Sequence, residues 1–445
     1  MKRIGRILPS LLIGAALLAP GTARAIPVET FEVPPGVSLL VSRQRHIPVV
    51  YMVMIFPGGT LAEPAGKGGL AAVTAELLQR GTGAHSSREF ATALDAIGAE
   101  LSVGADNDML TVTLSSLTDR LDEALELLAE LLASPAFDPT AFEKVRSQAL
   151  AALTAAEEGP GFLARRSMLE ALYSNHPYGR PRNGTEASLA TLTVGDCRAY
   201  WKRVSGPSGA IITAAGDVEG SDLAKRIRKR LAPWLAGSGK VFKEIPPLPP
   251  PRKPAFAKID GPFTQTTVLL GQRGIARTDP SYYAIQLFNY SLGGGGFSSR
   301  LLDEIRDNRG LVYAVYSRFD ARVLPGPFQI MLQTKNASAR EALALVRKEV
   351  RKALDEGISK KEIEDAKGYL IGTYPRRYDT NAKIARFLAA TAFHGLGTDY
   401  DRVYPEKIRA ITREEANKAA RELLDPSRFE TVAVGNLEAA GFSDR

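Results

Sequence analysis

Histidine and cysteine, which often bind catalytic metals or act as nucleophiles, are scarce in this chain of 445 residues. The single cysteine, Cys197, lies in a helix-like pattern and is expected to be a packing residue. No Ser/His/Asp or Cys/His arrangement stands out, and an independently active protease is the weakest interpretation. The four histidines are too far apart for any two to share adjacent helical turns: His46, His85, His176 and His394.

The glycine run Gly293–Gly296 is the other segment whose composition suits chemistry, because backbone N–H groups of such a run can cradle a phosphate. No Lys-Ser or Lys-Thr follows it, and no strand–G-x-G-x-x-G–helix context surrounds it. The sequence therefore predicts no nucleotide site. The run is interpreted as a helix C-cap and a flexible turn.

Two alternating segments, each followed by an amphipathic helix, predict mixed α and β structure. PFQIMLQTK leads into SAREALALVRKEV, where Ser338 and Glu341 are expected to form a capping box. MLTVTLSSL leads into a helix whose leucines fall on one face: Leu117, Leu121, Leu125, Leu128 and Leu132.

Similar residues recur at a nearly constant distance along the chain. Leu114 and Leu332 are 218 residues apart, and Gly216 and Gly435 are 219 apart. Such an offset indicates an internal duplication. The expected fold is α+β, with two homologous repeats that each pack a mostly antiparallel sheet against long helices.

A proline-rich stretch at 236–254 separates the two repeats. Proline disfavours helix and sheet interiors, so this stretch is expected to be a semi-rigid linker. The expected domains are therefore 26–235 and 255–445.

The first 25 residues have the layout of a secretory signal peptide. A basic start precedes an apolar core at 7–19, which is too short for a comfortable membrane span, and Ala23-Arg24-Ala25 is a small-x-small cleavage site. No later run approaches the roughly 20 apolar residues that a membrane helix needs. A periplasmic protein starting near Ile26 is expected, with an uncleaved anchor as the alternative.

The net charge gives little reason to expect nucleic-acid binding. Basic blocks at 225–230 and 347–352 lie on helix-like stretches and are interpreted as solvated faces. The formal net charge falls from +8 to +4 without the signal peptide, which carries four basic residues and no acid: Lys2, Arg3, Arg6 and Arg24.

This tandem repeat behind a signal peptide resembles the insulinase/pitrilysin family of inverted zincins over nearly the whole mature chain. GLAAVTAELLQRGT (69–82) is similar to the family's zinc helix, in which Gly-Leu-Ala precedes H-x-x-E-H. In that register the two histidines fall at Ala72 and Glu76, and the catalytic glutamate falls at Ala75. Methyl groups neither bind metal nor accept protons, so the resemblance implies no catalytic residue here.

The family's third zinc ligand, a downstream carboxylate, falls near Ala151 or Ala152 in the same register. Glu157 and Glu158 lie about two turns too late along a helix. The resemblance therefore implies that this chain carries no metal ligands and no zinc.

The segment 289–320 is similar to the family's C-terminal substrate-binding segment, in which an Arg and a Tyr seven residues apart face the zinc site. Here they are Arg306 and Tyr313. The resemblance implies that the Tyr hydroxyl donates to a developing oxyanion while the guanidinium holds a neighbouring carbonyl. The alternative is that Arg306 makes a surface ion pair on its helix and that Tyr313 packs in a strand. Gly294 and Gly295 are expected to contact substrate, as a glycine-rich loop does in the alpha subunit of mitochondrial processing peptidase.

A lost zinc helix beside an intact Arg/Tyr segment resembles one member of the family's split heterodimers. The resemblance implies a non-catalytic subunit that binds unfolded peptide for a zinc-bearing partner of the same family. The zinc cofactor is expected in that partner. The alternatives are a non-proteolytic scaffold and a peptide-binding homodimeric shell.

Overall fold

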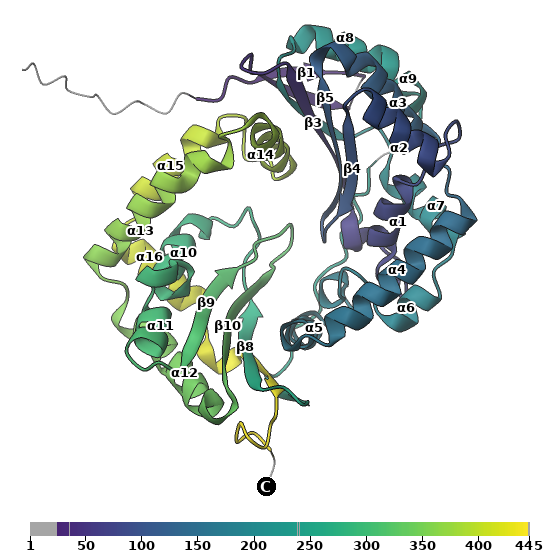
Figure 1. Cartoon of the computed structure of the whole chain (residues 1–445). Helices are drawn as coiled ribbons and strands as arrows, with labels where there is room; N and C mark the ends of the chain where they lie inside the picture. Colours follow the sequence, from purple (N-terminus) through teal and green to yellow (C-terminus); the bar gives the residue numbers. More distant parts are fainter. Residues whose placement is uncertain (1–24, 35, 238, 240, 444–445) are drawn as a thin grey trace, which may run out of the picture.

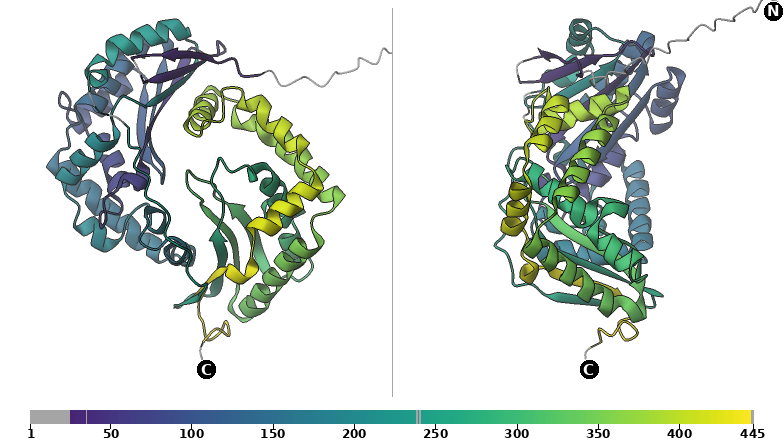
Figure 2. Two further views of the ribbon diagram at one scale, coloured as in Figure 1. Left: turned by 180° about the vertical axis from the view of Figure 1, so that it is seen from behind. Right: turned by 90° about the vertical axis from the view of Figure 1, so that its left-hand side faces the viewer.

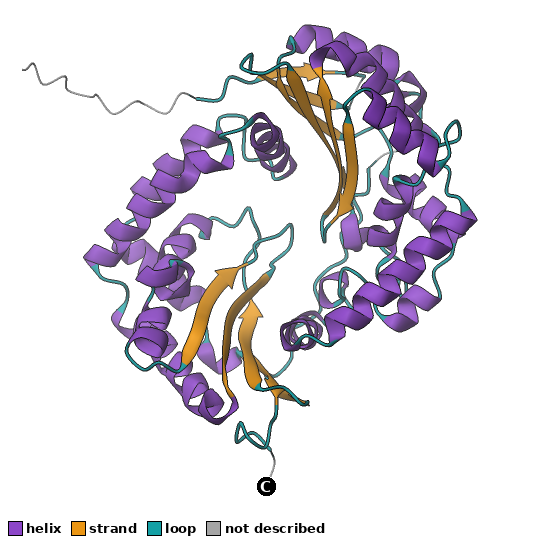
Figure 3. Ribbon diagram, in the orientation of Figure 1, coloured by secondary structure: helices purple, strands orange, loops and turns teal. Residues whose placement is uncertain are grey.

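The computed structural model describes residues 25–34, 36–237, 239 and 241–443. The expected signal peptide lies outside the described residues except for Ala25. The described chain forms two α+β halves: an N-terminal half with β1–β6 and α1–α9, and a C-terminal half with β7–β11 and α10–α16 (Figure 1). In both halves most helices lie outside the sheet, so the molecule has the outline of a shell (Figure 3).

The sheet of the N-terminal half has six strands in the order β1-β2-β6-β3-β5-β4. Within this described sheet β2 and β6 pair in parallel, and all other neighbours pair antiparallel. In sheet order the strands are β1 (Glu29–Glu32), β2 (Ser38–Arg43), β6 (Ile211–Gly216), β3 (Val49–Pro57), β5 (Met109–Leu117) and β4 (Glu100–Ala105).

The sheet of the C-terminal half has five strands in the order β7-β11-β8-β10-β9. Among its described neighbours, β7 and β11 are parallel and the rest antiparallel, so the expectation of mostly antiparallel sheets is confirmed in both halves. The strands are β7 (Phe256–Asp260), β11 (Glu430–Gly435), β8 (Gln265–Arg273), β10 (Pro327–Lys335) and β9 (Val312–Phe319).

The helices complete each half, and a short π-helical turn is labelled η. The N-terminal half contains α1 (Leu70–Leu78), α2 (Ser87–Ala96), α3 (Leu121–Ala133), α4 (Pro139–Glu157), α5 (Pro160–Tyr173), α6 (Glu186–Ala190), α7 (Val194–Val204), α8 (Gly220–Arg230) and α9 (Ala232–Leu235). The C-terminal half contains α10 (Tyr282–Asn289), η4 (Tyr290–Gly294), α11 (Arg300–Leu302), η6 (Asp303–Asp307), α12 (Ala339–Glu356), α13 (Lys360–Thr373), α14 (Asn381–Phe393), α15 (Tyr400–Ala410) and α16 (Arg413–Leu423). No described helix is long and apolar enough to cross a membrane.

The internal duplication is visible in the order and spacing of the elements. Strand β5 begins at Met109 and β10 begins 218 residues later, at Pro327. The first residues of β6 and β11, Ile211 and Glu430, are 219 residues apart. The same offsets therefore relate the sequence and the fold, as expected for two homologous repeats.

One helix from each half packs on the sheet of the other half. Helix α14 lies on β3 and β6, where Thr213 Oγ1 donates to the Ala385 carbonyl at 2.7 Å. Helix α5 lies on β8 and β11, and Arg273 Nε donates to the Leu172 carbonyl at 2.7 Å. Central strands such as β6 and β8 are buried along nearly their whole length, so other elements must pack on both faces of each sheet. Figure 2 shows these crossed helices from behind and from the side.

The described part of the proline-rich linker has no regular secondary structure, and it contacts both halves: the Pro249 carbonyl accepts from Arg273 Nη1 of β8 in the C-terminal half. Val241 N donates to the Ser208 carbonyl at 3.0 Å within the N-terminal half. The Pro246 carbonyl lies 3.1 Å from His176 Nε2, so His176 fixes the linker and the turn that it caps.

Two local expectations are wrong. Ser338 makes no side-chain cap bond, because the chain enters α12 through the 3-10 turn Asn336–Ser338 and Ser338 is already near-helical (φ −98°, ψ −5°). Leu117 is not on the face of a helix: it ends β5 and is 41% exposed, while α3 begins at Leu121. In both places a turn separates strand from helix.

Other local expectations are confirmed. Cys197 is fully buried on α7, as expected for a packing residue. In the basic block at 225–230, which ends α8, Lys225, Arg228 and Lys229 are exposed, as expected for a solvated face. Arg226 and Arg230 instead pair with Asp122 of α3, at 3.3 and 2.9 Å. These ion pairs join two outer helices of the same half.

Candidate functional site

Helix α1 occupies the position of the expected zinc helix, and its side chains do not form a metal site. Ala75 is buried, Ala72 is partly buried, and Glu76 is exposed. The Glu76 carboxylate lies 3.5 Å from the Arg80 guanidinium, one turn further along. A catalytic zinc site needs three protein ligands, so one exposed carboxylate with methyl groups at the two other positions does not fit the ion.

The position expected for the third ligand also lacks a donor. Ala151 and Ala152 are exposed on α4, which packs against α1. Glu157, further along α4, forms an ion pair with Arg166. Among the residues that the structure describes, no three His, Cys, Asp or Glu side chains form a group able to hold a metal ion.

Helix α1 is nevertheless firmly positioned at its start. Gly69 precedes it with φ +88°, and a Cβ there would lie 2.9 Å from the Asn183 carbonyl oxygen. Glu63 Oε1 accepts the Ala71 N–H at 2.9 Å, although Glu63 Oε2 is buried without a hydrogen bond. Burial raises the pKa of Glu63 to about 8. The helix is therefore capped by a carboxyl group that is mostly protonated at neutral pH.

The C-terminal half presents a different arrangement at β9, which we call the Arg306 cluster: Phe297, Arg306 and Tyr313. The Arg306 guanidinium carbon lies 5.1 Å from the Phe297 ring centroid and 5.7 Å from that of Tyr313. Tyr313 is 86% exposed and Phe297 is 78% exposed. The nearest acid to Arg306 is its neighbour Asp307, at 3.9 Å, which is a weak contact. The cluster is thus a cation held between two aromatic rings that face solvent.

A β-bulge directs Tyr313 outward. In the β9–β10 register Gln333 pairs with Ala314 and Thr334 pairs with Val312, so Tyr313 has no partner in the ladder. Extra residues at bulges turn side chains away from the regular alternation. Strand β9 is also an edge of its sheet, which leaves this side of Tyr313 uncovered.

The glycine run shapes the approach to Phe297. A Cβ on Gly293 would lie 2.5 Å from Ser317 Oγ, so only glycine lets the π-helical turn η4 pack on β9. Gly294 and Gly295 continue this turn against Asn289 and Tyr290 of the same segment. The run is therefore a compact turn that places Phe297 beside Arg306.

Phe297 is the residue of this cluster that the sequence interpretation did not include. An aromatic residue directly after four glycines was the available signal, because a large apolar side chain in such a turn lacks a local core. The structure brings Arg306 and Tyr313 together, but it places them in the opposite half from α1 (Figure 1).

Two homologous α+β repeats joined by a linker, with an inverted-zincin helix that lacks its ligands, define a class: non-catalytic peptidase-like shells. Two family models match the chain: "Insulinase (Peptidase family M16)" over residues 39–186 and "Peptidase M16 inactive domain" over 191–370. The crystal structure of a peptidase M16 inactive domain from Pseudomonas fluorescens has a TM-score of 0.86 and 30% identity, covering 92% of this chain and 98% of that one. This chain belongs to the insulinase family of peptidases, M16.

Curated relatives agree with this assignment. The non-peptidase homolog YmxG of Helicobacter pylori is 27% identical over 87% of this chain and 90% of its own. An uncharacterized zinc protease of Streptomyces coelicolor is 26% identical over 78% of this chain and 76% of its own. Together with the ligands missing from α1, these likenesses identify a non-catalytic member of the family. The periplasmic protease PqqL of Escherichia coli shares the fold, with a TM-score of 0.77 and 16% identity, over 98% of this chain and 49% of PqqL.

Proposed function

We propose that this protein is the non-catalytic, substrate-binding subunit of a heterodimeric metallopeptidase whose partner belongs to the same family and carries the zinc. One contrast carries the proposal. Helix α1 has no metal ligands, whereas the Arg306 cluster is assembled, exposed and free of a strong internal ion pair. Exposed aromatic and arginine side chains without a local structural partner are typical of binding sites.

The chemistry of the cluster suits the backbone of an unfolded peptide. The Tyr313 hydroxyl can donate to a carbonyl oxygen that gains negative charge, and the Arg306 guanidinium can donate to a neighbouring carbonyl. Phe297 and Tyr313 restrict the guanidinium from two sides, which lowers the entropy lost on binding. Recognition of the backbone predicts broad side-chain specificity.

The separation of α1 and the Arg306 cluster supports action on a second chain. Helix α1 belongs to the N-terminal half, and the Arg306 cluster belongs to the C-terminal half. The periplasmic protease PqqL is about twice as long as the part that this fold matches. We therefore infer that two chains of this size close one chamber.

The periplasm is the proposed location, because the first 25 residues have the layout of an export signal. Removal of that segment leaves a chain with one cysteine, which is buried, so the fold does not depend on disulfide formation.

The test is the zinc content of the tagged mature protein, isolated from its native periplasm with its bound companions. One zinc per pair of unlike chains, with none on this chain alone, is the expected result. Stoichiometric zinc on the isolated chain would refute the assignment. Complexes without any zinc would instead favour the scaffold or the homodimeric shell.

A further inference from the structure

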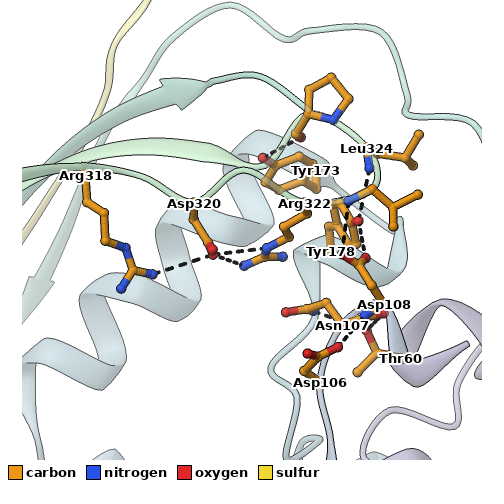
Figure 4. A network of polar contacts seen from close by, with 12 residues as sticks. Thr60, Asp106, Asn107, Asp108, Tyr173, Tyr178, Arg318, Asp320, Arg322 and Leu324 are labelled. Carbon is orange, nitrogen blue, oxygen red and sulfur yellow. Dashed lines mark hydrogen bonds and ion pairs between the residues drawn. The ribbon is translucent and has the colours of Figure 1, made fainter. Parts of the chain in front are cut away.

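A cavity of about 640 Å³ lies where the two halves meet, apart from the Arg306 cluster. The β4–β5 turn, α5 and the loop at 180–183 supply its wall from the N-terminal half. The β9–β10 hairpin and the residue after α14, His394, supply the wall from the C-terminal half. Figure 4 shows the part of this wall around Asp108 and Asp320.

The lining of this cavity is strongly basic. Three acids line it: Asp106, Asp108 and Asp320. Six arginines line it, four from the N-terminal half and two from the C-terminal half: Arg165, Arg166, Arg180, Arg182, Arg318 and Arg322. The arginines come from both halves, so the tertiary fold assembles this charge.

All three acids are engaged within the wall. Asp320 accepts from Arg322 Nη2 at 2.6 Å and lies 3.6 Å from Arg318 (Figure 4). Asp106 Oδ1 accepts two backbone N–H groups of its own turn, at 2.8 and 2.9 Å. Asp108 accepts from the Tyr178 hydroxyl and from a backbone N–H of the β9–β10 hairpin. Asp108 thus joins the two halves, while Asp106 and Asp320 are bound within their own half.

Several arginines keep unused donors. Arg165 and Arg182 are exposed, and neither forms an ion pair with any residue that the structure describes. Arg180 donates to two backbone carbonyls, which leaves its charge uncompensated. Arg322 Nη1 is buried without a hydrogen bond, although the other side of this guanidinium binds Asp320. A buried unpaired donor costs free energy, which an incoming acceptor can recover.

We propose that this cavity binds a carboxylate of the peptide that the chain recognises, so that its substrates are acidic peptides. The planar guanidinium fork matches a carboxylate with two parallel hydrogen bonds. The inference rests on the proposed function, because it assigns a substrate class to the same chamber.

Strand β9 connects the two sites. Tyr313 and Arg318 are both exposed on β9, five residues apart. At roughly 3.3 Å per residue, they are separated by about 17 Å along the strand. In an extended peptide bound by Tyr313, the side chain of a residue about five positions along the peptide therefore reaches the cavity.

The experiment measures binding of two fluorescein-labelled synthetic peptides to the full mature chain by fluorescence anisotropy. One peptide carries a block of glutamates in an alanine–serine backbone, and the other has glutamine at each of those positions. The test variant is Arg165→Gln with Arg182→Gln. The control is Arg351→Gln with Arg421→Gln, which removes the same charge from exposed sites on α12 and α16.

The test variant is expected to weaken binding of the glutamate peptide about tenfold and to leave the glutamine peptide unchanged. The control variant should change neither. Equal affinities of the unmodified chain for both peptides, or equal losses in both variants, would overturn the carboxylate site. Amidated and free-acid forms of each peptide distinguish a chain-terminal carboxylate from glutamate side chains.

The two proposals fail separately. Tyr313→Ala should weaken the binding of both peptides, because it removes contacts with the peptide backbone. If Tyr313→Ala has no effect while glutamate discrimination persists, the role of Tyr313 is wrong and the cavity assignment holds. If Tyr313→Ala weakens the binding of both peptides and the unmodified chain binds the glutamate and glutamine peptides equally well, only the cavity assignment is wrong.

Discussion

At the scale of single residues, the Arg306 cluster and α1 differ in what their side chains can do. A guanidinium between two exposed rings has donors to offer, whereas Ala72 and Ala75 have none. Peptidase activity of the proposed complex therefore tests the cluster, because the proposed partner would carry out the hydrolysis that is measured.

Truncation of Tyr313 or Arg306 to alanine is expected to lower kcat/KM of the complex without preventing its assembly. A loss of about 10- to 100-fold corresponds to the contribution of one charge-stabilising donor. Tyr313→Phe should show most of that loss, because it removes only the hydroxyl. Steady-state peptide hydrolysis measures the effect, and size-exclusion chromatography checks assembly.

Tyr369→Phe is the matched control for Tyr313→Phe. Tyr369 is also an exposed tyrosine, and its ring packs on Tyr290 outside the Arg306 cluster, with centroids 4.9 Å apart. Normal hydrolysis by all the cluster variants would show that the complex does not use these side chains.

At the scale of elements, α1 has kept its place while losing its ligands. Glu63 caps it, Gly69 lets it start against the 183–184 turn, and its leucines fill the core of the N-terminal half. The helix is thus maintained by packing, which does not depend on a metal ion.

The stability of the protein should depend on pH through Glu63. The pKa of Glu63 is about 8 in the folded chain, against 4.5 for the reference carboxyl, because burial disfavours its charged form. The folded state therefore holds this proton more tightly, and its contribution to the free energy of unfolding falls as pH rises from 4.5 to about 8.

Glu63→Gln removes that titration. The Tm of this variant minus the Tm of the unmodified protein should increase between pH 5 and pH 9, measured by circular dichroism. Glu100→Gln, on the exposed edge of β4, is the control and should show a constant difference. A constant difference for Glu63→Gln as well would mean that Glu63 is ionised in the folded chain.

At the scale of the whole molecule, the exchanged helices α5 and α14 connect the two halves, and we expect the halves to unfold together. Leu388 of α14 is fully buried in an apolar cluster with Val53 and Ile55 of β3. A loss of packing on α14 should therefore destabilise the N-terminal half, although α14 belongs to the C-terminal half.

Leu388→Ala is expected to lower the free energy of unfolding by about 2–5 kcal/mol, as for other buried leucines. Both tryptophans, Trp201 and Trp234, are buried in the N-terminal half. In Leu388→Ala, the midpoint of thermal unfolding measured by tryptophan fluorescence should fall together with the midpoint measured by circular dichroism. Arg386→Ala, on the exposed face of α14, is the control. An unchanged fluorescence midpoint for Leu388→Ala would show that the halves unfold independently.

The sequence by itself determined the features that depend on local patterns. Period-two alternation in MLTVTLSSL and PFQIMLQTK predicted β5 and β10, and the offset of 218–219 residues predicted the repeat. The absence of zinc ligands followed from residue types alone, because Ala72 and Ala75 cannot coordinate a metal in any fold. The cap expected at Ser338 failed because the 3-10 turn before α12 is not encoded by the capping pattern.

Only the tertiary structure decided which distant residues share a site. The bulge that turns Tyr313 outward arises from its pairing with β10, and Phe297 reaches Arg306 because Gly293 packs on Ser317. The exchange of α5 and α14 and the arginine-lined cavity join segments more than a hundred residues apart. Such contacts depend on how whole elements pack, and no periodicity within one segment contains that information.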